Sequence, residues 1–309
     1  MQCTPMKPEP PVTSTSSPLI RTSCSRRGIR VTVREATRSE LLNGVADAPT
    51  EGIIVKIVII GGTGLIGSKV AQRLTAQGHE VVAASPNTGV NTLTGEGVAE
   101  ALEGAQVVID VSNSPSFAPD DVLAFFETST NTLLAAEQAA GVAHHVALSI
   151  VGSDGLPDSG YMRAKVAQER LIRDGGVPYS IVHATQFFEF GKAIADGATD
   201  GDTVRIAPVK FRPIASDDVA DAVAAVATGE PVRGAVEIAG PEESRFDEFI
   251  AAALAARGDE RTVVADPAAE YFGTKLDDGS LVPADASSAR LGATTFEQWT
   301  AAQASAPTR

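Results

Sequence analysis

The chain has 309 residues, of which 43% are hydrophobic, so it can bury one large α/β core or two small ones. Its formal net charge of −14 repels nucleic-acid phosphates and anionic lipid headgroups, and we expect neither nucleic acid nor membrane as a partner. No apolar run approaches the roughly 20 residues of a membrane-spanning helix, and both cysteines precede residue 30, so we expect a soluble cytoplasmic protein with no metal site.

The first 53 residues differ in composition from the rest of the chain. They are rich in Pro, Ser, Thr and Arg and show no sustained apolar periodicity, which is typical of a disordered tail. A second interpretation is that the natural chain starts at Val55, immediately before the first predicted strand. We therefore expect a tail over residues 1–53 and a single domain over residues 54–309.

The domain opens with a βαβ unit. The run "VKIVII" (55–60) is short, β-branched and apolar, which is typical of a strand buried on both faces. It is followed by the turn "GGTGLIG" (61–67), by a predicted helix that ends at Gly78, and by a second strand over residues 79–85. Strand, turn, helix and strand in about 30 residues form a βαβ unit.

The glycines of this turn fit the G-x-G-x-x-G spacing of dinucleotide-binding loops. Gly62 would permit the tight turn, Gly64 would let backbone approach a pyrophosphate, and Gly67 would pack the helix against the strand. The helix N-terminus adds free N–H groups and a positive dipole. An ordinary glycine turn is the alternative. The context favours a dinucleotide held by Gly61, Gly62, Thr63, Gly64, Leu65, Ile66 and Gly67.

Strands and helices continue to alternate along the chain. Strands are expected at 105–113, 145–152 and 177–185, and helices at 120–141 and around Tyr161. This alternation predicts an α/β fold with a Rossmann-type, doubly wound parallel sheet. After residue 186 the elements shorten, which indicates a smaller C-terminal portion that caps the substrate cleft. We divide the domain into a cofactor-binding core (54–185) and a substrate-side portion (186–309).

A Tyr-x-x-x-Lys pair, Tyr161 and Lys165, opens the helix that follows the strand over 145–152. Residues four apart share one helical face, so the hydroxyl and the ammonium can both point at a nicotinamide ribose. A nearby ammonium favours the phenolate and would lower the tyrosine pKa from about 10 toward working pH. Ser149 ends the preceding strand, where its hydroxyl could hydrogen-bond a substrate carbonyl oxygen. The alternative is a helix face that only binds cofactor or packs.

Several blocks of the chain resemble one family. The segments "GGTGLIG", "GHEVV", "ALEGAQVVID", "AAEQAAGVAHHVALS", "GYMRAK", "YSIVHATQFFEF", "RPIASDDVADAV" and "IAGPEE" are each similar to blocks of the atypical short-chain dehydrogenase/reductases of the NmrA-like, NAD(P)-binding group. The match runs from about Val55 to Trp299. The resemblance implies that Tyr161 is the acid/base, that Lys165 orients the ribose and lowers the tyrosine pKa, and that Ser149 polarises the carbonyl. NmrA-like relatives often lose this tyrosine, so its presence favours catalysis.

The chain departs from the family pattern after its second strand. Relatives commonly have an acidic residue there for NAD or an arginine for NADP, whereas this chain has "SPNT" (85–88). The hydroxyl and amide groups of Ser85 and Asn87 could accommodate a 2′-phosphate. We therefore favour NADP as the cofactor, with NAD as the alternative.

Other positions carry weaker expectations. Relatives place a loop near the cofactor ribose where this chain has Ser112 and Asn113. His183 stands where many relatives have an arginine, and we expect it on the substrate side with Gln186 and Phe187. The phenylalanine could be part of an apolar substrate wall or could simply pack in the core.

Three functions remain open from the sequence. The first is an NAD(P)H-dependent oxidoreductase that moves hydride to or from a small carbonyl or quinone-like substrate. The second is an NmrA-like redox sensor that binds NAD(P) without turnover, and the third is an epimerase or isomerase that uses tightly held NAD. The expected partner is a small-molecule substrate, and the expected state is a monomer or homodimer.

Overall fold

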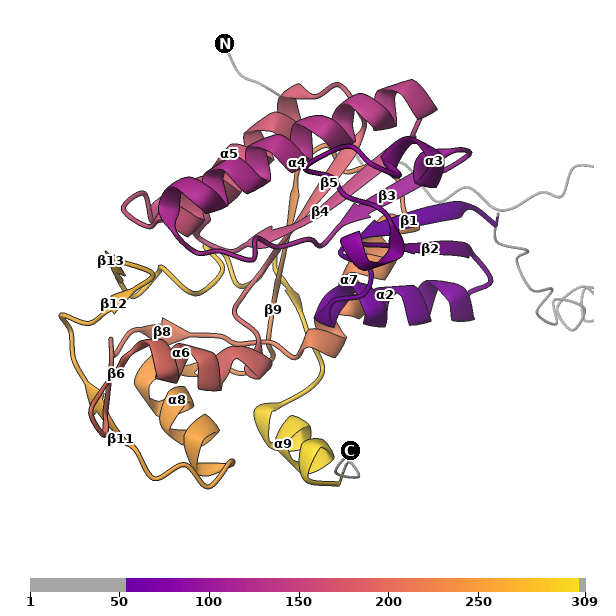
Figure 1. Ribbon diagram of the computed structural model, residues 1–309. Coiled ribbons are helices and arrows are strands. Elements are labelled where there is room, and N and C mark those ends of the chain that lie inside the picture. Colours follow the sequence, from indigo (N-terminus) through magenta and orange to yellow (C-terminus); the bar gives the residue numbers. More distant parts are fainter. Residues whose placement is uncertain (1–53, 306–309) are drawn as a thin grey trace, which may run out of the picture. The chain divides into compact units, whose positions relative to one another are not determined.

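The computed structural model describes residues 54–305, and Figure 1 shows their arrangement. The predictions for residues 1–53 lie outside the described residues. The described chain belongs to one compact unit, Ile53–Arg309. No helix among the described residues is both long and apolar enough to cross a membrane.

A seven-stranded sheet with parallel pairing throughout forms the centre of the unit. Its strands lie in the order β14-β9-β5-β4-β3-β1-β2. Their bounds are β1 Lys56–Ile60, β2 Glu80–Ala84, β3 Val107–Asp110, β4 His144–Ile150, β5 Tyr179–Ala184, β9 Ala235–Ala239 and β14 Arg290–Leu291. The predicted Rossmann-type parallel sheet is confirmed. The apolar runs fit this position because a parallel sheet buries both of its faces.

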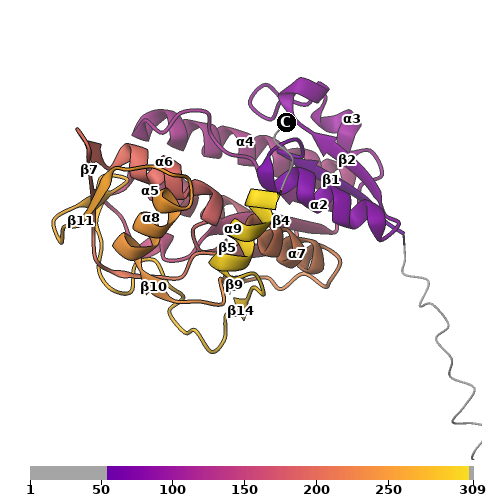
Figure 2. The same cartoon turned by 90° about the horizontal axis from the view of Figure 1, so that it is seen from below.

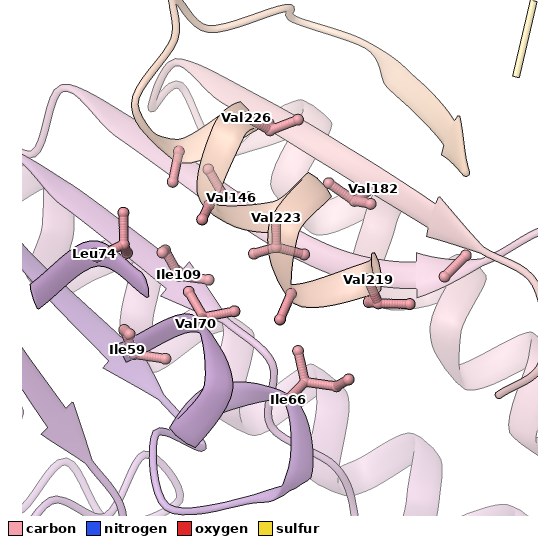
Figure 3. Packing of buried hydrophobic residues seen from close by; sticks show 14 of the residues in the cluster. Ile59, Ile66, Val70, Leu74, Ile109, Val146, Val182, Val219, Val223 and Val226 are labelled. Carbon is pink, nitrogen blue, oxygen red and sulfur yellow. The ribbon is translucent and has the colours of Figure 1, made fainter. Parts of the chain in front are cut away.

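Helices cover both faces of the sheet. The helices of this layer are α2 Leu65–Ala76, α3 Val98–Leu102, α4 Pro119–Ala140, α5 Gly160–Asp174 and α7 Ser216–Ala227. On one face, Val70 of α2 and Val223 of α7 pack over Ile59 and Ile109 of the strands, as Figure 3 shows. On the other face, Leu133 of α4 packs with residues of β1 and β3. Alternate strand residues therefore serve two separate cores.

The order of the strands creates a crevice between β1 and β3. From β1 the chain passes to β2 on one side, then crosses back to β3 on the other side. The loops after these two strands therefore lead to opposite faces of the sheet, and the place where they part is called a topological switch point. Ligands of open α/β sheets bind there, beyond the carboxyl ends of the strands. The fold thus places the glycine turn, residues 61–64, at the ligand-binding edge.

The residues after 185 form a smaller part beside the sheet, but they also complete the sheet. The predicted boundary does not separate sheet from cap, because β9 pairs with β5 and β14 pairs with β9. The smaller part holds α6 Gly191–Gly197, β6 Thr199–Asp200, β7 Thr203–Ile206, β8 Lys210–Phe211, β10 Ser244–Arg245, α8 Phe246–Ala255, β11 Thr262–Ala265, β12 Glu270–Tyr271, β13 Thr274–Lys275 and α9 Phe296–Ser305.

An aromatic core holds the smaller part together. The ring centroid of Phe211 lies 4.5 Å from that of Phe246 and 5.1 Å from that of Phe249. Phe188 and Trp299 belong to the same buried cluster. In Figure 2, α6, α8 and β11 gather at one end of the view, and α2, β1 and β2 at the other. The two cores therefore support two walls of one cleft.

Candidate active site

A large cleft lies over the carboxyl ends of the central strands. Its volume is about 1350 Å³, and its walls come from the turn after β1, the segments after β2 and β3, the ends of β4 and β5, helix α5, helix α6 and the β12–β13 hairpin. Sites for small molecules and cofactors typically occupy roughly 300–1,000 Å³. The cleft is thus large enough for a dinucleotide and a second ligand.

The glycines of the turn after β1 have different surroundings. A Cβ on Gly62 would lie 2.7 Å from both Ala83 Cα and the Ile59 carbonyl oxygen, and a Cβ on Gly67 would lie 2.3 Å from the Gly61 carbonyl oxygen. These glycines are needed for packing. A Cβ on Gly64 would meet only the Gly61 carbonyl oxygen, at 3.2 Å, and Gly64 lines the cleft. Gly64 is therefore the position where a ligand can approach the backbone.

Most of the predicted cofactor-binding residues line the cleft together. They are Gly61, Thr63, Gly64, Leu65, Ile66, Ser85, Asn87, Ser112, Asn113 and Lys165. Gly62 and Gly67 do not line it and instead pack the turn against its neighbours. The first turn of α2 starts at Leu65, where a helix leaves backbone N–H groups free. The structure therefore brings the predicted phosphate cradle and the predicted ribose contacts into one site.

Tyr161 is positioned by the start of α5. The Ser159 hydroxyl accepts a hydrogen bond from the Met162 N–H and caps this helix. The Tyr161 hydroxyl donates a hydrogen bond to Asn113 Oδ1 at 3.1 Å. Burial raises the pKa of Tyr161 to about 12, although its hydrogen bond with Asn113 opposes the shift. The predicted lowering of the tyrosine pKa is therefore wrong for this arrangement, because burial outweighs the hydrogen bond with Asn113 and no cation within residues 54–305 is among the causes of the shift.

Lys165 is buried one helical turn further along α5. Its ammonium donates a hydrogen bond to the Leu148 carbonyl at 2.9 Å and another to the Gln168 side chain, and it lies 4.4 Å from the centre of the Phe126 ring. Burial lowers the pKa of Lys165 to about 8, against the opposing effect of the nearby carboxylates Asp110 and Glu169. Among the contacts of residues 54–305, none joins this ammonium to the Tyr161 hydroxyl.

A buried carboxylate that the sequence analysis missed connects Lys165 to the loop after β3. Asp110 ends β3 and accepts hydrogen bonds from the Ser112 N–H and hydroxyl, at 3.0 and 2.6 Å. It also accepts one from Gln168 Nε2 at 2.9 Å. Because Gln168 bonds Lys165 as well, the network fixes the loop with Ser112 and Asn113 relative to helix α5.

Ser149 and His183 face a second buried carboxylate, Glu169 of α5. The Ser149 hydroxyl donates to Glu169 Oε1 at 2.5 Å, and His183 Nε2 lies 3.0 Å from the same oxygen. Arg173 bonds the other oxygen at 2.6 Å. Burial would raise the pKa of Glu169, but the contacts with His183, Ser149 and Arg173 outweigh it and lower this pKa.

This arrangement corrects the expectation for His183 and changes that for Ser149. His183 does not line the cleft, because its side chain lies in β5 and faces α5. Ser149 does line the cleft, but its proton is donated to Glu169 rather than toward the cleft. One sequence signal could have located Glu169: it lies four residues after Lys165 and shares that face of the helix.

The end of β5 presents buried polar groups without partners. The Thr185 hydroxyl and both amide atoms of Gln186 have no hydrogen-bond partner among the described residues, and both side chains line the cleft. The Ser85 hydroxyl, also buried in the cleft wall, is in the same condition. Buried polar groups are normally paired, so these atoms are suited to bind a ligand. Phe187 lines the cleft beside them.

The residues present fit a dinucleotide. At Gly64 only the Gly61 carbonyl oxygen is near the place of a Cβ, so a phosphate could approach the helix start, and the Ser85 hydroxyl of the cleft wall has no hydrogen-bond partner among the described residues. No group of three or more His, Cys, Asp or Glu side chains able to hold a metal ion occurs within the described part of the chain. A phenol, an ammonium and a serine hydroxyl on one wall can hold and move a proton.

Comparisons with known proteins concern the family and the fold of the chain. A protein-family model described as NAD(P)H-binding matches residues 61–230. The photosystem II assembly factor Ycf39 of Cyanophora paradoxa is 26% identical over 149 residues, which are 44% of this chain and 46% of that protein. The chain therefore matches less than half of the length of this relative.

Solved structures share the fold. The NADPH-dependent quinone oxidoreductase QOR2 of Escherichia coli has a TM-score of 0.56 at 18% identity, over 80% of this chain and 99% of that one. The UDP-glucose 4-epimerase of Thermus thermophilus, solved with NAD, has a TM-score of 0.56 at 18% identity, over 73% of this chain and 91% of that one. At these identities the likeness concerns the fold alone.

Proposed function

Because this chain belongs to the NAD(P)H-binding family, we propose that it is an oxidoreductase that transfers hydride between NAD(P)H and a small carbonyl or quinone-like compound. The observation that carries the proposal is the position of Tyr161, whose ring lines the same cleft as the open glycine Gly64. A group able to transfer a proton would therefore share the cleft with the glycine turn that would bind the cofactor phosphates. The fold likeness to both a reductase and an epimerase is consistent with such chemistry.

The cofactor would be held at both ends of the cleft. The N–H groups of Leu65 and Ile66 would bind the pyrophosphate, and Ser85 and Asn87 would contact the adenosine ribose. Asn113 and Lys165 would hold the nicotinamide ribose. When bound, the cofactor supplies or accepts the hydride. We favour NADP over NAD because "SPNT" (85–88) offers no carboxylate to repel a 2′-phosphate.

Tyr161 would serve as the acid when a carbonyl is reduced. With a pKa of about 12 its hydroxyl stays protonated at neutral pH, so it can donate its proton to the oxygen that gains charge. The overall balance is one carbonyl, one NAD(P)H and one proton giving one alcohol and one NAD(P)⁺. Lys165, charged below its pKa of about 8, would stabilise the phenolate that is left once its ammonium turns from Leu148 and Gln168 toward that oxygen.

Ser149 would support the substrate only after its hydroxyl turns. It donates its proton to Glu169, which leaves an oxygen lone pair but no proton for a carbonyl. Rotation toward the cleft would make it a second donor to the substrate oxygen. Gln186, with both amide atoms unpartnered among the described residues, is a further group able to orient a polar substrate.

Two other functions keep specific support. A redox sensor without turnover is favoured by the separation of Lys165 from the Tyr161 hydroxyl, since the ammonium is engaged with Leu148 and Gln168. An epimerase or isomerase with tightly held NAD is favoured by the likeness to the Thermus thermophilus epimerase. Copurification of bound NAD would support the latter.

The test is an assay of the purified full chain with NADPH and with NADH against a panel of aldehydes, ketones and quinones. We expect consumption of the reduced nicotinamide, faster with NADPH, with at least one member of the panel. Stoichiometric cofactor binding without consumption across the panel would contradict the proposal and favour the sensor. A faster reaction with NADH would overturn the preference for NADP alone.

A further inference from the structure

The ring of Tyr161 lies within a group of phenylalanine rings contributed by distant parts of the chain. Phe272 stacks on Tyr161 with centroids 5.4 Å apart and an interplanar angle of 26°, and Phe117 lies 5.4 Å from Tyr161 at 58°. Phe117 and Phe272 are themselves 5.7 Å apart. Phe126 closes the group from helix α4 at 6.4 Å. Three ring contacts on one tyrosine make a continuous aromatic surface.

Phe117 and Phe272 are open to the cleft, unlike most large rings of the described chain. Their side chains are 53% and 41% exposed and line the cleft, whereas Phe126 is fully buried. Two adjacent exposed rings on the wall of a concave site leave apolar faces in contact with water. A flat apolar ligand would cover these faces and release that water.

Phe272 reaches this position through an unfavourable backbone conformation. It is at the tip of the hairpin formed by β12 and β13, where Tyr271 pairs with Thr274 and only Phe272 and Gly273 connect the strands (Figure 1). Both residues have positive φ, 49° and 75°. Such two-residue turns favour Asn, Asp or Gly at the first position, and a bulky residue there is strained.

The neighbouring residue of the hairpin, Tyr271, is packed against the aromatic core of the smaller part. The Tyr271 ring packs edge-on against buried Phe246 at 5.6 Å and against Phe272 at 4.7 Å. The strained ring is therefore presented by an anchored turn rather than by a free loop. Strain that the surrounding structure maintains next to a site is a sign of a functional role.

We propose that Phe117 and Phe272 form a stacking platform that selects flat, conjugated ring carbonyls, such as aryl aldehydes and quinones, over saturated carbonyls of similar size. The proposal rests on the proposed function, because it names the substrate class of that site. The substrate ring would lie on the exposed ring faces with its carbonyl oxygen toward the Tyr161 hydroxyl. In an aldehyde the carbonyl carbon gains the hydride and its oxygen gains the proton, as balanced above. One quinone with one NAD(P)H and one proton would give one hydroquinone and one NAD(P)⁺.

The test compares benzaldehyde with cyclohexanecarbaldehyde, which differ in flatness and conjugation but little in size. The measured quantity is the ratio of their kcat/KM values in the wild type, Phe272→Leu, Phe272→Gly and Phe272→Tyr. We expect the ratio to fall roughly threefold to tenfold in the leucine and glycine variants and to stay in the tyrosine variant. The glycine variant suits the positive φ, so it keeps the test valid if the leucine variant does not fold.

A matched control and a binding measurement complete the test. Phe190→Leu removes another exposed ring of the cleft, one that stacks on Phe187 instead, and should leave the ratio unchanged. Equilibrium dialysis of 2-naphthaldehyde without cofactor should show the same threefold to tenfold loss in Phe272→Leu. Loss of this binding without turnover in any variant supports the platform and contradicts the proposed reaction. Turnover with an unchanged ratio and unchanged binding overturns the platform and leaves the proposed function standing.

Discussion

Lys165 carries its charge at a buried position, where the charged form is disfavoured. Its side chain is 3% exposed and its pKa is lowered to about 8 from an ordinary 10.5. Because the folded chain releases this proton more easily than the unfolded chain, stability rises as the pH increases from about 8 to 10.5. At pH 7 the lowered pKa costs about 3 kcal/mol of stability. Such a cost at a cleft is expected where a residue serves function rather than folding.

The first prediction concerns this lysine. Lys165→Met should unfold at a temperature equal to or above that of the wild type at pH 7, because it removes a buried charge, and the difference should shrink by about pH 9.5. The same variant should bind NADPH at least roughly tenfold more weakly at pH 7. In the wild type, affinity should fall above about pH 8 as the ammonium loses its proton. The measurements are thermal unfolding and fluorescence titration at both pH values.

The exposed Lys210 supplies the control. Lys210→Met should show neither a pH-dependent difference in unfolding nor a loss of affinity. A Lys165→Met variant that is less stable than the wild type by the same amount at both pH values would contradict the lowered pKa. The lysine would then be an ordinary structural side chain.

The second prediction concerns Tyr161. Tyr161→Phe keeps the ring and its stacking on Phe272 but removes the proton and the hydrogen bond to Asn113. We expect kcat to fall roughly 10²- to 10⁴-fold while the Kd for NADPH stays within twofold. Steady-state kinetics and titration measure the two quantities. If the kcat of Tyr161→Phe is within threefold of that of the wild type, the hydroxyl has no catalytic role. Tyr161 and Lys165 would then be two residues that only share one face of a helix.

For single residues, the sequence predicted which ones line the cleft better than it predicted the burial and the partners of their side chains. Tyr161, Lys165 and the cleft-lining glycines were located because their motifs are local and follow predicted strands. The direction of the Tyr161 pKa could not be predicted, since it depends on burial by segments far along the chain. His183 was misplaced because a strand position alone does not say which partner its face meets.

The turn before α2 combines a structural and a binding role in neighbouring glycines. Gly67 is blocked by the Gly61 carbonyl and Gly62, whereas Gly64 opens to the cleft with a φ of −80°, which any residue can adopt. The same chemical change at the two positions should therefore have different consequences. At Gly67 the lack of a side chain lets the turn pack against its neighbours, and at Gly64 it gives a ligand access to the backbone.

The third prediction separates these roles. Gly67→Ala should lower stability by about 1–3 kcal/mol through overpacking, a fall of roughly 2–10 °C in Tm for a domain of this size. Gly64→Val should change Tm little but abolish NADPH binding, because the side chain occupies the phosphate's place. Thermal unfolding and NADPH titration give both readings. Equal NADPH affinity in Gly64→Val and wild type would mean that the glycine turn is only a turn.

Elements with strong periodicity were predictable, and short ones were not. The strands over 55–60 and 177–185 correspond to β1 and β5, and the helix over 120–141 corresponds to α4. The two-residue strand β14 and the β12–β13 hairpin carry no periodic signal, and long-range pairing alone defines them. The platform residue Phe272 therefore could not be found from the sequence.

Across the whole molecule, two cores with different chemistry support one cleft. Aliphatic residues of the sheet and its helices support the wall that contains the glycine turn, and aromatic residues of the smaller part support the wall that contains the β12–β13 hairpin. Both cores contain residues from before and after residue 185, because Val223 of α7 belongs to the sheet core and Met162 of α5 belongs to the aromatic core. The division at residue 185 therefore separates neither the sheet nor the two cores. From the net charge of −14 we predict that the chain does not bind nucleic acid. That it is a monomer or a homodimer also stays a prediction.

The central claim is that this cleft transfers hydride from NAD(P)H to a carbonyl carbon. The most direct measurement uses NADPH with deuterium in both C4 positions of the nicotinamide, incubated with the full chain and the best aldehyde or ketone of the panel, followed by mass spectrometry of the alcohol. We predict one deuterium on the former carbonyl carbon in the wild type, from one of the two C4 faces, and a rate reduced roughly 10²- to 10⁴-fold in Tyr161→Phe. An alcohol without deuterium, or no alcohol with NADPH bound, would contradict the account.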